Sequence, residues 1–578
     1  MSNYVSSVAA IHSPVTLRTL GLFTLYFIHE TDSAIIDFGR QNRPSSAAKK
    51  LAIGTLEIRE EVMKQLSRRR FVSGAAALST LPLIWPHTAR AQAASVLKYR
   101  VFTDMQVLDP PFRLTAPEGD VITAIFPKLV SFEPGDSWKW RPDAAEEIEQ
   151  VDDTHIRFKL RRGLKWTNGF GEVTAEDVKY SFERVTDPKL QAPYKDDWSA
   201  LDHVEVTDPY SGVIVLKEYF APLWWSTLPW NTASIICKKA TEAAGGRFTT
   251  QPPATCGPYM WKEWQPKQRL ILQRDPNWTG EQGAYDEIHV IPIEDDKTAE
   301  IAIQAGDLDM TRTSLSSLAT IRTQPPKGLK VLEKPSLAYW WVGMNTENAA
   351  LSDEKVRKAI QKAIDVDMII DAAFFGIPKR STGIIAPGLL GHRDITPPAR
   401  DLEGAKALFA EAGSAAPKNL TLSILNTTEN KSAAQIVQQN LADLGIEVAI
   451  NPYDGGTFWT LGDQKSGQAW KDLQLIINYF TMAPDPSWAT AWFTCDQVGV
   501  WNWERWCNKE FSDLHKALLA ERDDAKRDVG YKHMQDLMEG SGAYVFITHG
   551  VNAALYSDKI APATLPDGRV VLQLFKPA

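Results

Sequence analysis

Tryptophan is the residue type in this sequence whose number and spacing most clearly indicate a chemical role. The chain contains 20 tryptophans, and five of them fall within 19 residues: Trp488, Trp492, Trp501, Trp503 and Trp506. Indole rings stack on sugar faces, apolar side chains and cations, so such a group indicates a binding cleft. Core packing explains the same group equally simply, because Trp buries a large area and the first two are one helical turn apart.

Motifs for catalysis are missing from the sequence. It has no GxxxxGK[ST] phosphate loop, no HExxH zinc motif and no GxSxG nucleophile elbow, and the segment that starts at Gly540 lacks the third glycine of GxGxxG. The ten histidines are scattered, and paired catalytic carboxylates are not recognisable without geometry. These absences leave an enzyme unsupported rather than excluded, and we identify no cofactor and no metal site in the sequence. A secreted hydrolase is the alternative from another class.

The composition argues against two other classes. The chain has 578 residues, of which 44% are hydrophobic and 23% charged, and its formal net charge is −8. An acidic excess does not suit a nucleic-acid binder. A bilayer-spanning helix needs about 18 continuous apolar residues, and the longest early run, residues 20–28, falls well short of that.

An export signal is predicted at residues 67–93. Three arginines, Arg68 to Arg70, precede a mildly apolar stretch, and Ala91-Gln92-Ala93 suits signal cleavage. Ser-Arg-Arg-Arg-Phe-Val closely resembles the twin-arginine signal. We expect a mature chain that begins at Ala94 and is periplasmic, and we interpret residues 1–66 as a spurious or disordered leader, since Met63 suits a natural initiator. No cysteine stands directly after the cleavage site, so we expect no lipid anchor at the new N-terminus.

All four cysteines lie in the predicted mature chain. An even number of cysteines in an exported protein favours disulfides, and pairing of sequence neighbours predicts Cys237–Cys256 and Cys495–Cys507. Neither pair is CxxC and no histidine lies close by, which makes a zinc or redox site the weaker interpretation.

The elements that would position these residues alternate between strands and helices. Apolar and charged residues alternate over residues 155–160, which predicts a half-buried strand. Thr174 begins a capping box for one helix, and Ser352 and Ser432 are the expected caps of two others. The last of these helices stops at Gly445 and leads directly into a strand over residues 446–450. A helix that leads into a strand is typical of an α/β fold.

Several blocks occur in the order and spacing of a known family. The most specific are FKLRRGLKW at 158–166 and TAEDVKYSF at 174–182; the others include LDP at 108–110, CGPY at 256–259, GDLD at 306–309, NT at 345–346 with VRKA at 356–359, and DP at 485–486. From residue 97 to its end the chain resembles the extracytoplasmic solute-binding proteins of the peptide/nickel/opine ABC transporters, the dipeptide- and oligopeptide-binding protein family.

The resemblance implies an α/β, two-lobed periplasmic-binding-protein fold (a Venus flytrap) with an extra inserted subdomain. By analogy we expect a first lobe built from three segments, an inserted subdomain, and a second lobe. The expected boundaries are 94–129, 231–336 and 545–578 for the first lobe, 130–230 for the inserted subdomain, and 337–544 for the second lobe. Such a protein does no chemistry and works by lobe closure around a solute.

The sequence differs from the dipeptide binders at the positions that hold the two ends of the peptide. The family holds the peptide amine with an Asp three residues before the late DP pair, and Met482 stands at that place here. The family holds the carboxylate with an Arg in the loop that corresponds to residues 426–431. This loop contains no Arg, and Lys431 offers a point charge without the bidentate fork of a guanidinium. A dipeptide is therefore less favoured as the solute than an opine, a sugar conjugate, a cationic amine or a longer peptide.

We expect five residues to face the solute: Trp341, Tyr479, Asp485, Trp488 and Trp503. Only one of the adjacent Trp340 and Trp341 can face a given side of a strand; we choose Trp341 and keep Trp340 as the core alternative. Asp485 either pairs with a solute cation or caps a turn before proline.

The sequence thus predicts the periplasmic binding component of an ABC importer for a peptide or peptide-like solute, including opines. The expected partners are that small solute and the permease and ATPase subunits, and the protein is expected to be a monomer. A receptor for an oligosaccharide or for an amine or betaine is the alternative within binding proteins.

Overall fold

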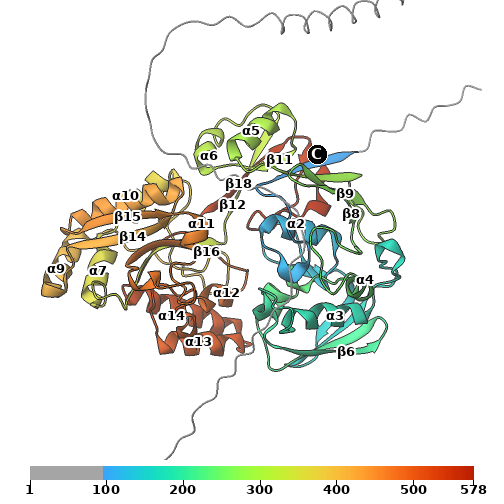
Figure 1. The fold of residues 1–578 in the computed structure, drawn as a ribbon, viewed down its shortest axis with the longest axis horizontal. Coiled ribbons are helices and arrows are strands. Elements are labelled where there is room, and N and C mark those ends of the chain that lie inside the picture. The colour runs from blue at the N-terminus through green and yellow to red at the C-terminus, as the bar shows by residue number, and fades with distance from the viewer. Residues whose placement is uncertain (1–94) are drawn as a thin grey trace, which may run out of the picture. The chain divides into compact units, whose positions relative to one another are not determined.

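Two large mixed sheets organise the chain in the computed structural model, which describes residues 95–578 (Figure 1). The described residues belong to one compact unit. We call the seven-stranded sheet with its helices the first lobe and the five-stranded sheet with its helices the second lobe. Among residues 95–578, no helix combines the length and apolar character that crossing a membrane requires.

The sheet of the first lobe combines strands from distant parts of the chain. Its strands, in spatial order, are β12 (Leu329–Pro335), β18 (Val551–Ser557), β11 (Met310–Arg312), β1 (Val96–Val101), β10 (Glu287–Pro292), β9 (Arg269–Arg274) and β8 (Tyr259–Gln265). β1 runs parallel to both of its neighbours, β10 and β11, whereas the other pairs are antiparallel. The three central strands therefore end at the same edge of the sheet.

The sheet of the second lobe is built in a similar way. In spatial order it contains β15 (Glu447–Tyr453), β14 (Asn419–Leu425), β16 (Leu475–Thr481), β13 (Ala338–Met344) and β17 (Tyr544–Thr548). β14 is parallel to β15 and β16, and β13 is antiparallel to β16 and β17. One face packs on α7, α8 and α10 through fully buried residues such as Val342, Leu422 and Val437.

A four-stranded antiparallel sheet lies within the segment predicted as the inserted subdomain. Its strands are β4 (Ala145–Gln150), β5 (His155–Leu160), β7 (Ser211–Leu216) and β6 (Leu201–Asp208), and two small ribbons pair β2 (Val130–Phe132) with β3 (Trp140–Pro142) and β19 (Ile560–Ala561) with β20 (Lys576–Pro577). The domain boundaries stay a prediction. The strand β17 extends to Thr548, past the point at 545 where we expected the chain to return to the first lobe.

Helices connect the strands of all three sheets. They are α2 (Ala116–Ile125), α3 (Ala175–Thr186), α4 (Lys238–Ala243), α5 (Asp296–Ala305), α6 (Leu315–Ile321), α7 (Glu354–Ala363), α8 (Val366–Phe374), α9 (Leu402–Ala412), α10 (Thr428–Ala442), α11 (Gly455–Phe458), α12 (Pro486–Ala491), α13 (Lys509–Leu519) and α14 (Asp524–Gly540).

The local predictions hold where the pattern is strongest. β5 spans the predicted residues 155–160 with alternating burial, and Thr174 caps α3 through a capping box with Asp177. Two helix starts were wrong. Asp353, not Ser352, caps α7, because its carboxylate accepts the Lys355 N–H whereas the Ser352 hydroxyl donates to the Ala349 carbonyl.

The other wrong start concerns α10. This helix begins at Thr428, because the Thr427 hydroxyl caps it by accepting the Asn430 N–H at 3.2 Å. Ser432 therefore lies inside the helix. The predicted inward residues Val437 and Leu441 are fully buried.

The chain crosses between the two sheets at two adjacent places. One crossing, Ser336–Leu337, joins β12 to β13, and the other, His549–Gly550, joins β17 to β18. The two crossings lie side by side, because β12 is the neighbour of β18 in the first sheet and β13 is the neighbour of β17 in the second. Gly550 has a φ of +67°, and a Cβ at this position would lie 2.7 Å from the Trp340 ring, so both the backbone and the packing require glycine.

The structure confirms one of the two predicted disulfides. Cys495 and Cys507 are bonded, whereas Cys237 and Cys256 are separate thiols. The pairing of Cys237 with Cys256 was wrong because packing, rather than distance in sequence, fixes both side chains. Each is at most 2% exposed in the core of the first lobe: Cys237 precedes α4, and the Cys256 N–H donates to the Ile125 carbonyl beside α2.

Replacing both Cys495 and Cys507 with serine is expected to lower the free energy of unfolding by about 3 kcal/mol, since the bridge closes a short loop in the unfolded chain. Denaturant unfolding of the oxidised proteins measures the difference. Alkylation of the unfolded, unreduced wild type should label Cys237 and Cys256 alone. A Cys237–Cys256 cross-linked peptide in a non-reducing map would contradict the assignment.

Candidate solute-binding cleft

The carboxyl ends of parallel strands mark where ligands bind in open α/β sheets. In the first lobe, β1, β10 and β11 end together, which brings Phe102, Ile293 and Arg312 to one edge. In the second lobe, β14 and β15 end together at Asn426 and Asp454. Each lobe therefore has one edge that suits a solute.

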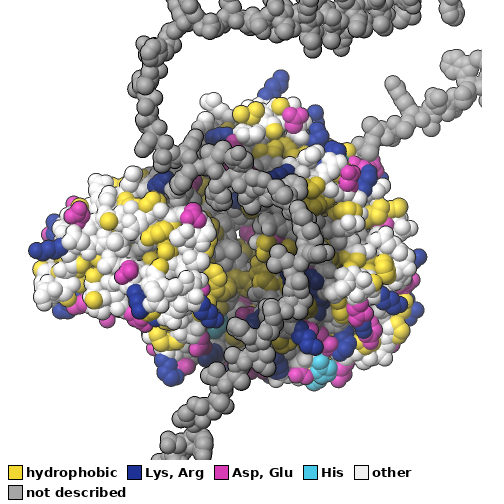
Figure 2. Space-filling view, viewed as in Figure 1, with side chains coloured by type: hydrophobic (Ala, Val, Ile, Leu, Met, Phe, Trp, Pro, Cys, Tyr) yellow, Lys and Arg dark blue, Asp and Glu magenta, His cyan; other side chains and the backbone are white. Residues whose placement is uncertain are grey.

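An aromatic cluster lies at the edge of the second lobe. The Tyr479 ring stacks on the Trp340 ring with a distance of 5.1 Å between the ring centroids. It meets the Trp459 ring edge-on with a centroid distance of 5.6 Å. Phe480 contacts Trp501 at 6.0 Å, and the Trp501 side chain is 37% exposed. Figure 2 shows hydrophobic side chains in the central hollow on this face of the molecule. Half-exposed rings of this kind give a solute apolar surface to stack on.

A pocket of about 620 Å³ is lined by both lobes and by the segment predicted as the inserted subdomain. Its volume lies within the usual range for small-molecule sites, about 300–1,000 Å³. Its walls include the crossing at Lys334–Leu337, the loop Ala386–Leu390, the turn Pro484–Pro486, and side chains of α14.

Asp485 is the one predicted site residue that lines this pocket. One carboxylate oxygen accepts the Ser487 N–H at 2.9 Å and caps α12, while the other accepts from Arg527 at 2.6 Å. The side chains of both ions are at most 2% exposed. The turn-capping interpretation of Asp485 is thus satisfied in the structure, and its charge is already balanced. Breaking such a buried pair leaves an uncompensated charge, which costs about 3–5 kcal/mol.

The predicted tryptophans occupy more enclosed positions. Trp341 is 1% exposed and donates its indole N–H to Glu504 at 2.7 Å. Trp503 is also 1% exposed, covers Gly462 and packs on Phe458 at 5.4 Å. Trp488 is half-buried against Trp492. Strand alternation places Trp340 on the other face of β13 from Trp341, beside Tyr479.

Sequence reasoning missed a second aromatic wall. Trp138 and Trp225 line the pocket, and the Arg569 guanidinium carbon lies 4.3 Å from the Trp230 ring centroid and 5.5 Å from that of Trp138. These rings are widely separated in sequence from the late tryptophan group. The signal that could have found them is the density of Trp224, Trp225 and Trp230 within seven residues.

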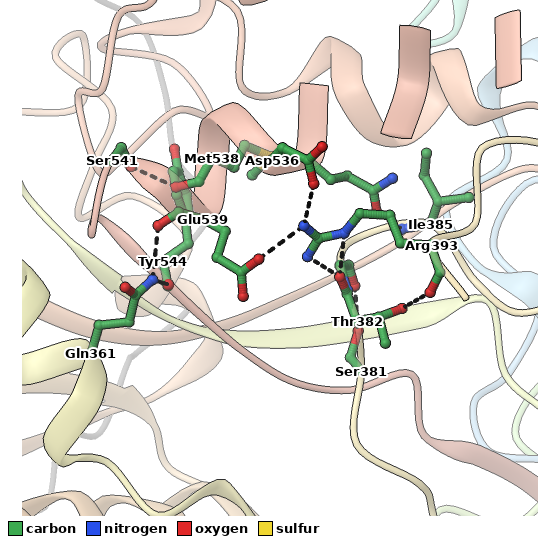
Figure 3. A network of polar contacts seen from close by, with 12 residues as sticks. Gln361, Ser381, Thr382, Ile385, Arg393, Asp536, Met538, Glu539, Ser541 and Tyr544 are labelled. Atoms are coloured by element: carbon green, nitrogen blue, oxygen red, sulfur yellow. Dashed lines mark hydrogen bonds and ion pairs between the residues drawn. The ribbon is translucent and has the colours of Figure 1, made fainter. Parts of the chain in front are cut away.

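A polar network fixes the loop that carries Ala386–Leu390 (Figure 3). Arg393, whose side chain is 4% exposed, pairs with Asp536 at 2.7 Å and Glu539 at 2.9 Å on α14, and its Nε donates to the Thr382 carbonyl. The Gln535 amide donates to the Gly391 carbonyl at 2.8 Å. These contacts bind both ends of the loop to one helix, so the pocket wall is held in a defined position.

A buried acid lies beneath β13. Glu504 Oε1 accepts the Trp341 indole N–H, while Oε2 is buried without a hydrogen-bond partner. Gly343 makes room for this carboxyl group, since a Cβ there would collide with Oε1. Burial raises the pKa of Glu504 to about 7 despite the hydrogen bond from Trp341, which lowers it.

The comparisons with known proteins agree with this architecture. Residues 139–499 match the family described as bacterial extracellular solute-binding proteins, family 5 Middle. The periplasmic oligopeptide-binding protein OppA of Salmonella typhimurium is 26% identical over 493 residues, which cover 78% of this chain and 87% of that protein.

Two solved structures share the fold. HbpA2 from Haemophilus parasuis superposes with a TM-score of 0.72 at 21% identity and covers 84% of this chain and 100% of its own. The protein AgaA from A. tumefaciens R10, in complex with agropinic acid, has a TM-score of 0.68 at 22% identity and covers 84% of this chain and 99% of its own.

The chain belongs to the bacterial extracellular solute-binding proteins of family 5, because the family match spans more than half of it. It is an extracytoplasmic substrate-binding protein that serves an ABC importer, and it binds its solute without transforming it. The two-lobed α/β fold and the family implied by the sequence resemblance are confirmed.

Through Glu504, the stability of the protein is expected to fall as the pH rises from about 4.5 to about 7. Its pKa in the folded state is raised, so the protonated form stabilises the fold and this contribution is lost as the pH rises through about 7. Glu504→Gln keeps an acceptor for Trp341 but does not ionise. Between pH 6 and pH 8.5 the free energy of unfolding of the wild type should fall by about 1.4 kcal/mol more than that of the variant.

Denaturant unfolding at the two pH values measures this difference. Burial also raises the pKa of Asp120 and Asp197 to about 7, but both are present in wild type and variant, so their contributions cancel. Equal pH dependence of the two proteins would show that Glu504 is not the buried acid that titrates.

Proposed function

We propose that this chain captures a peptide or peptide-like solute, including opines, between its two lobes and delivers it to the permease and ATPase subunits of an ABC importer. The observation that carries the proposal is the pocket of about 620 Å³ lined by both lobes, next to an aromatic edge of the second lobe. A protein named for oligopeptide binding and one solved with an opine are among its relatives.

The surroundings of the expected peptide clamps favour a solute other than a plain dipeptide. Met482, at the place of the amine-binding Asp, is 3% exposed and carries no charge. Lys431 is exposed in the first turn of α10, and its ammonium group cannot bind a carboxylate through two parallel N–H groups as a guanidinium does. A longer peptide or an opine, whose charged groups lie elsewhere, suits this pattern better.

The five predicted site residues divide by their position relative to the pocket and the aromatic cluster. We propose that Tyr479 and Asp485 lie nearest the solute, since Tyr479 is half-buried in the aromatic cluster and Asp485 lines the pocket. Trp488 packs edge-on against Trp492, which in turn packs on Trp501 of the cluster. Trp341 and Trp503, whose side chains are covered, would position their neighbours.

A thermal-shift screen against di- to pentapeptides, opines, betaines and oligosaccharides tests the solute class. A solute present at 100 times its Kd should stabilise the protein by about 2.7 kcal/mol. Stabilisation by peptides or opines alone agrees with the proposal. Stabilisation only by oligosaccharides or betaines would contradict it and favour the alternative receptor.

Two neighbouring tryptophans make a matched pair for the solute found in this screen. Trp501→Ala removes an exposed ring and should weaken binding by about 1–3 kcal/mol while the melting temperature is unchanged. Trp503→Ala removes a buried ring and should cost about 3–5 kcal/mol of folding stability. Calorimetric titration and denaturant unfolding separate the two effects. A stable Trp503→Ala protein with lost affinity would instead place Trp503 at the solute, as the sequence alone suggested.

We further propose export to the periplasm by the twin-arginine route. Arg68 and Arg69, and the whole predicted signal, lie outside the described residues, so the proposal depends on the sequence motif. Lys at both positions should leave the precursor in the cytoplasm, as fractionation and immunoblotting would show. The intact mass of the wild-type mature protein should correspond to a chain that begins at Ala94. Normal maturation of the double variant would contradict this route.

A further inference from the structure

Most basic side chains around the pocket are neutralised by carboxylates. Lys334 contacts Asp136, Arg527 pairs with Asp485, and Nε of Arg569 donates to Asp567 at 2.6 Å. Such pairs leave little positive charge for a solute. A peptide with a free carboxyl end needs a cation that the protein has not already balanced.

Arg312 is such a cation, at the carboxyl edge of the first lobe's parallel strands rather than in the wall of the pocket. Across residues 95–578, its side chain has no ion-pair or hydrogen-bond partner, and it is exposed. Its guanidinium carbon lies 5.7 Å from the ring centroid of Phe102, which is 36% exposed. The arginine is the last residue of β11, and Phe102 directly follows β1, so both lie at the carboxyl edge of the parallel strands.

The backbone of Arg312 is fixed by the sheet, although its guanidinium has no partner among the described residues. Its backbone pairs with Ala554 of β18, and the neighbouring Thr313 N–H donates to the Ala553 carbonyl at 3.1 Å. Three residues further along, Leu315 packs against the core of the second lobe together with Trp340. Trp340 in turn stacks on Tyr479. The segment that follows Arg312 therefore reaches the second lobe, which also carries the aromatic cluster.

The charge of Arg312 acts on residues of both lobes. Burial raises the pKa of Tyr99 in the first lobe and of Tyr479 in the second, and the positive charge of Arg312 opposes both increases. Because these phenols belong to different sheets, the guanidinium lies within electrostatic reach of both facing edges. It can therefore meet a solute that is enclosed between them.

We propose that Arg312 binds the carboxylate of the solute, a role that rests on the proposed function. A guanidinium offers two parallel N–H donors to a carboxylate, which gives a directional, charge-assisted contact. It would supply from the first lobe the guanidinium that residues 426–431 of the second lobe lack. Tyr479 and Phe102 would flank the bound group, so solutes with a free terminal carboxylate are selected over those in which it is blocked.

The test uses two synthetic libraries of di- to pentapeptides that differ only at the C-terminus, one as free acids and the other as amides. The mature protein is incubated with each library, separated by gel filtration, and its retained peptides are quantified by mass spectrometry. Wild type should retain the acids at least tenfold better than the amides. Arg312→Gln should lose this preference, and Arg312→Lys should keep part of it.

Arg162→Gln is the matched control, since Arg162 is an exposed arginine whose guanidinium lies 4.8 Å from the Tyr210 ring centroid in the segment predicted as the inserted subdomain. It should behave as wild type, which excludes an effect of net charge. Arg312→Gln should keep the wild-type melting temperature, because Arg312 makes no side-chain hydrogen bond within residues 95–578.

The outcomes separate the two proposals. Retention of neither library by the wild type would overturn the capture of peptides, and with it the role of Arg312 in binding their carboxylate. Retention by the wild type with an unchanged acid preference in Arg312→Gln would overturn the role of Arg312 alone. Loss of the preference in Arg162→Gln as well would also overturn it, since bulk charge would then explain the effect.

Discussion

The double crossing of the chain between the two sheets is the constraint on which the rest of the structure depends. The crossings are Ser336–Leu337 and His549–Gly550. The strands that enter them, β12 and β17, are neighbours of the strands that leave the other crossing, β18 and β13, so the lobes are connected along one line. Rotation about a pair of adjacent strands is the simplest motion that such a connection allows, and it is a typical hinge. The packing of Trp340 over Gly550 then ties the hinge to the aromatic edge of the second lobe.

Charge is distributed around the pocket in a way that separates structural from binding roles. Asp485 with Arg527, and Arg393 with Asp536 and Glu539, form pairs in which the arginine is buried, and they hold α12, α14 and the loop Ala386–Leu390 together. Pairs of this kind are costly to break and contribute a fixed geometry to the walls. Arg312 has no such partner within the described residues, and so its charge remains available to a solute.

The aromatic surfaces serve a complementary purpose. Tyr479, Trp459, Phe480 and Trp501 present half-exposed rings on the second lobe, and Trp138 and Trp225 present half-buried rings in the wall of the pocket. Stacking surfaces tolerate many side chains, whereas a charged anchor demands one chemical group. A cleft with both features would accept varied peptide-like solutes and still require a terminal carboxylate.

The sequence by itself determined the family, the α/β character, β5, the cap of α3 and the Cys495–Cys507 bridge. These features depend on periodicity, spacing and contacts between residues close in the chain. Only the tertiary structure decided which face of β13 is covered, because Trp341 meets Glu504 from 163 positions away. It likewise left Cys237 and Cys256 unbonded and brought Arg312 to the edge nearest Tyr479. Side-chain direction at these sites is set by packing between distant segments, and no local pattern encodes that packing.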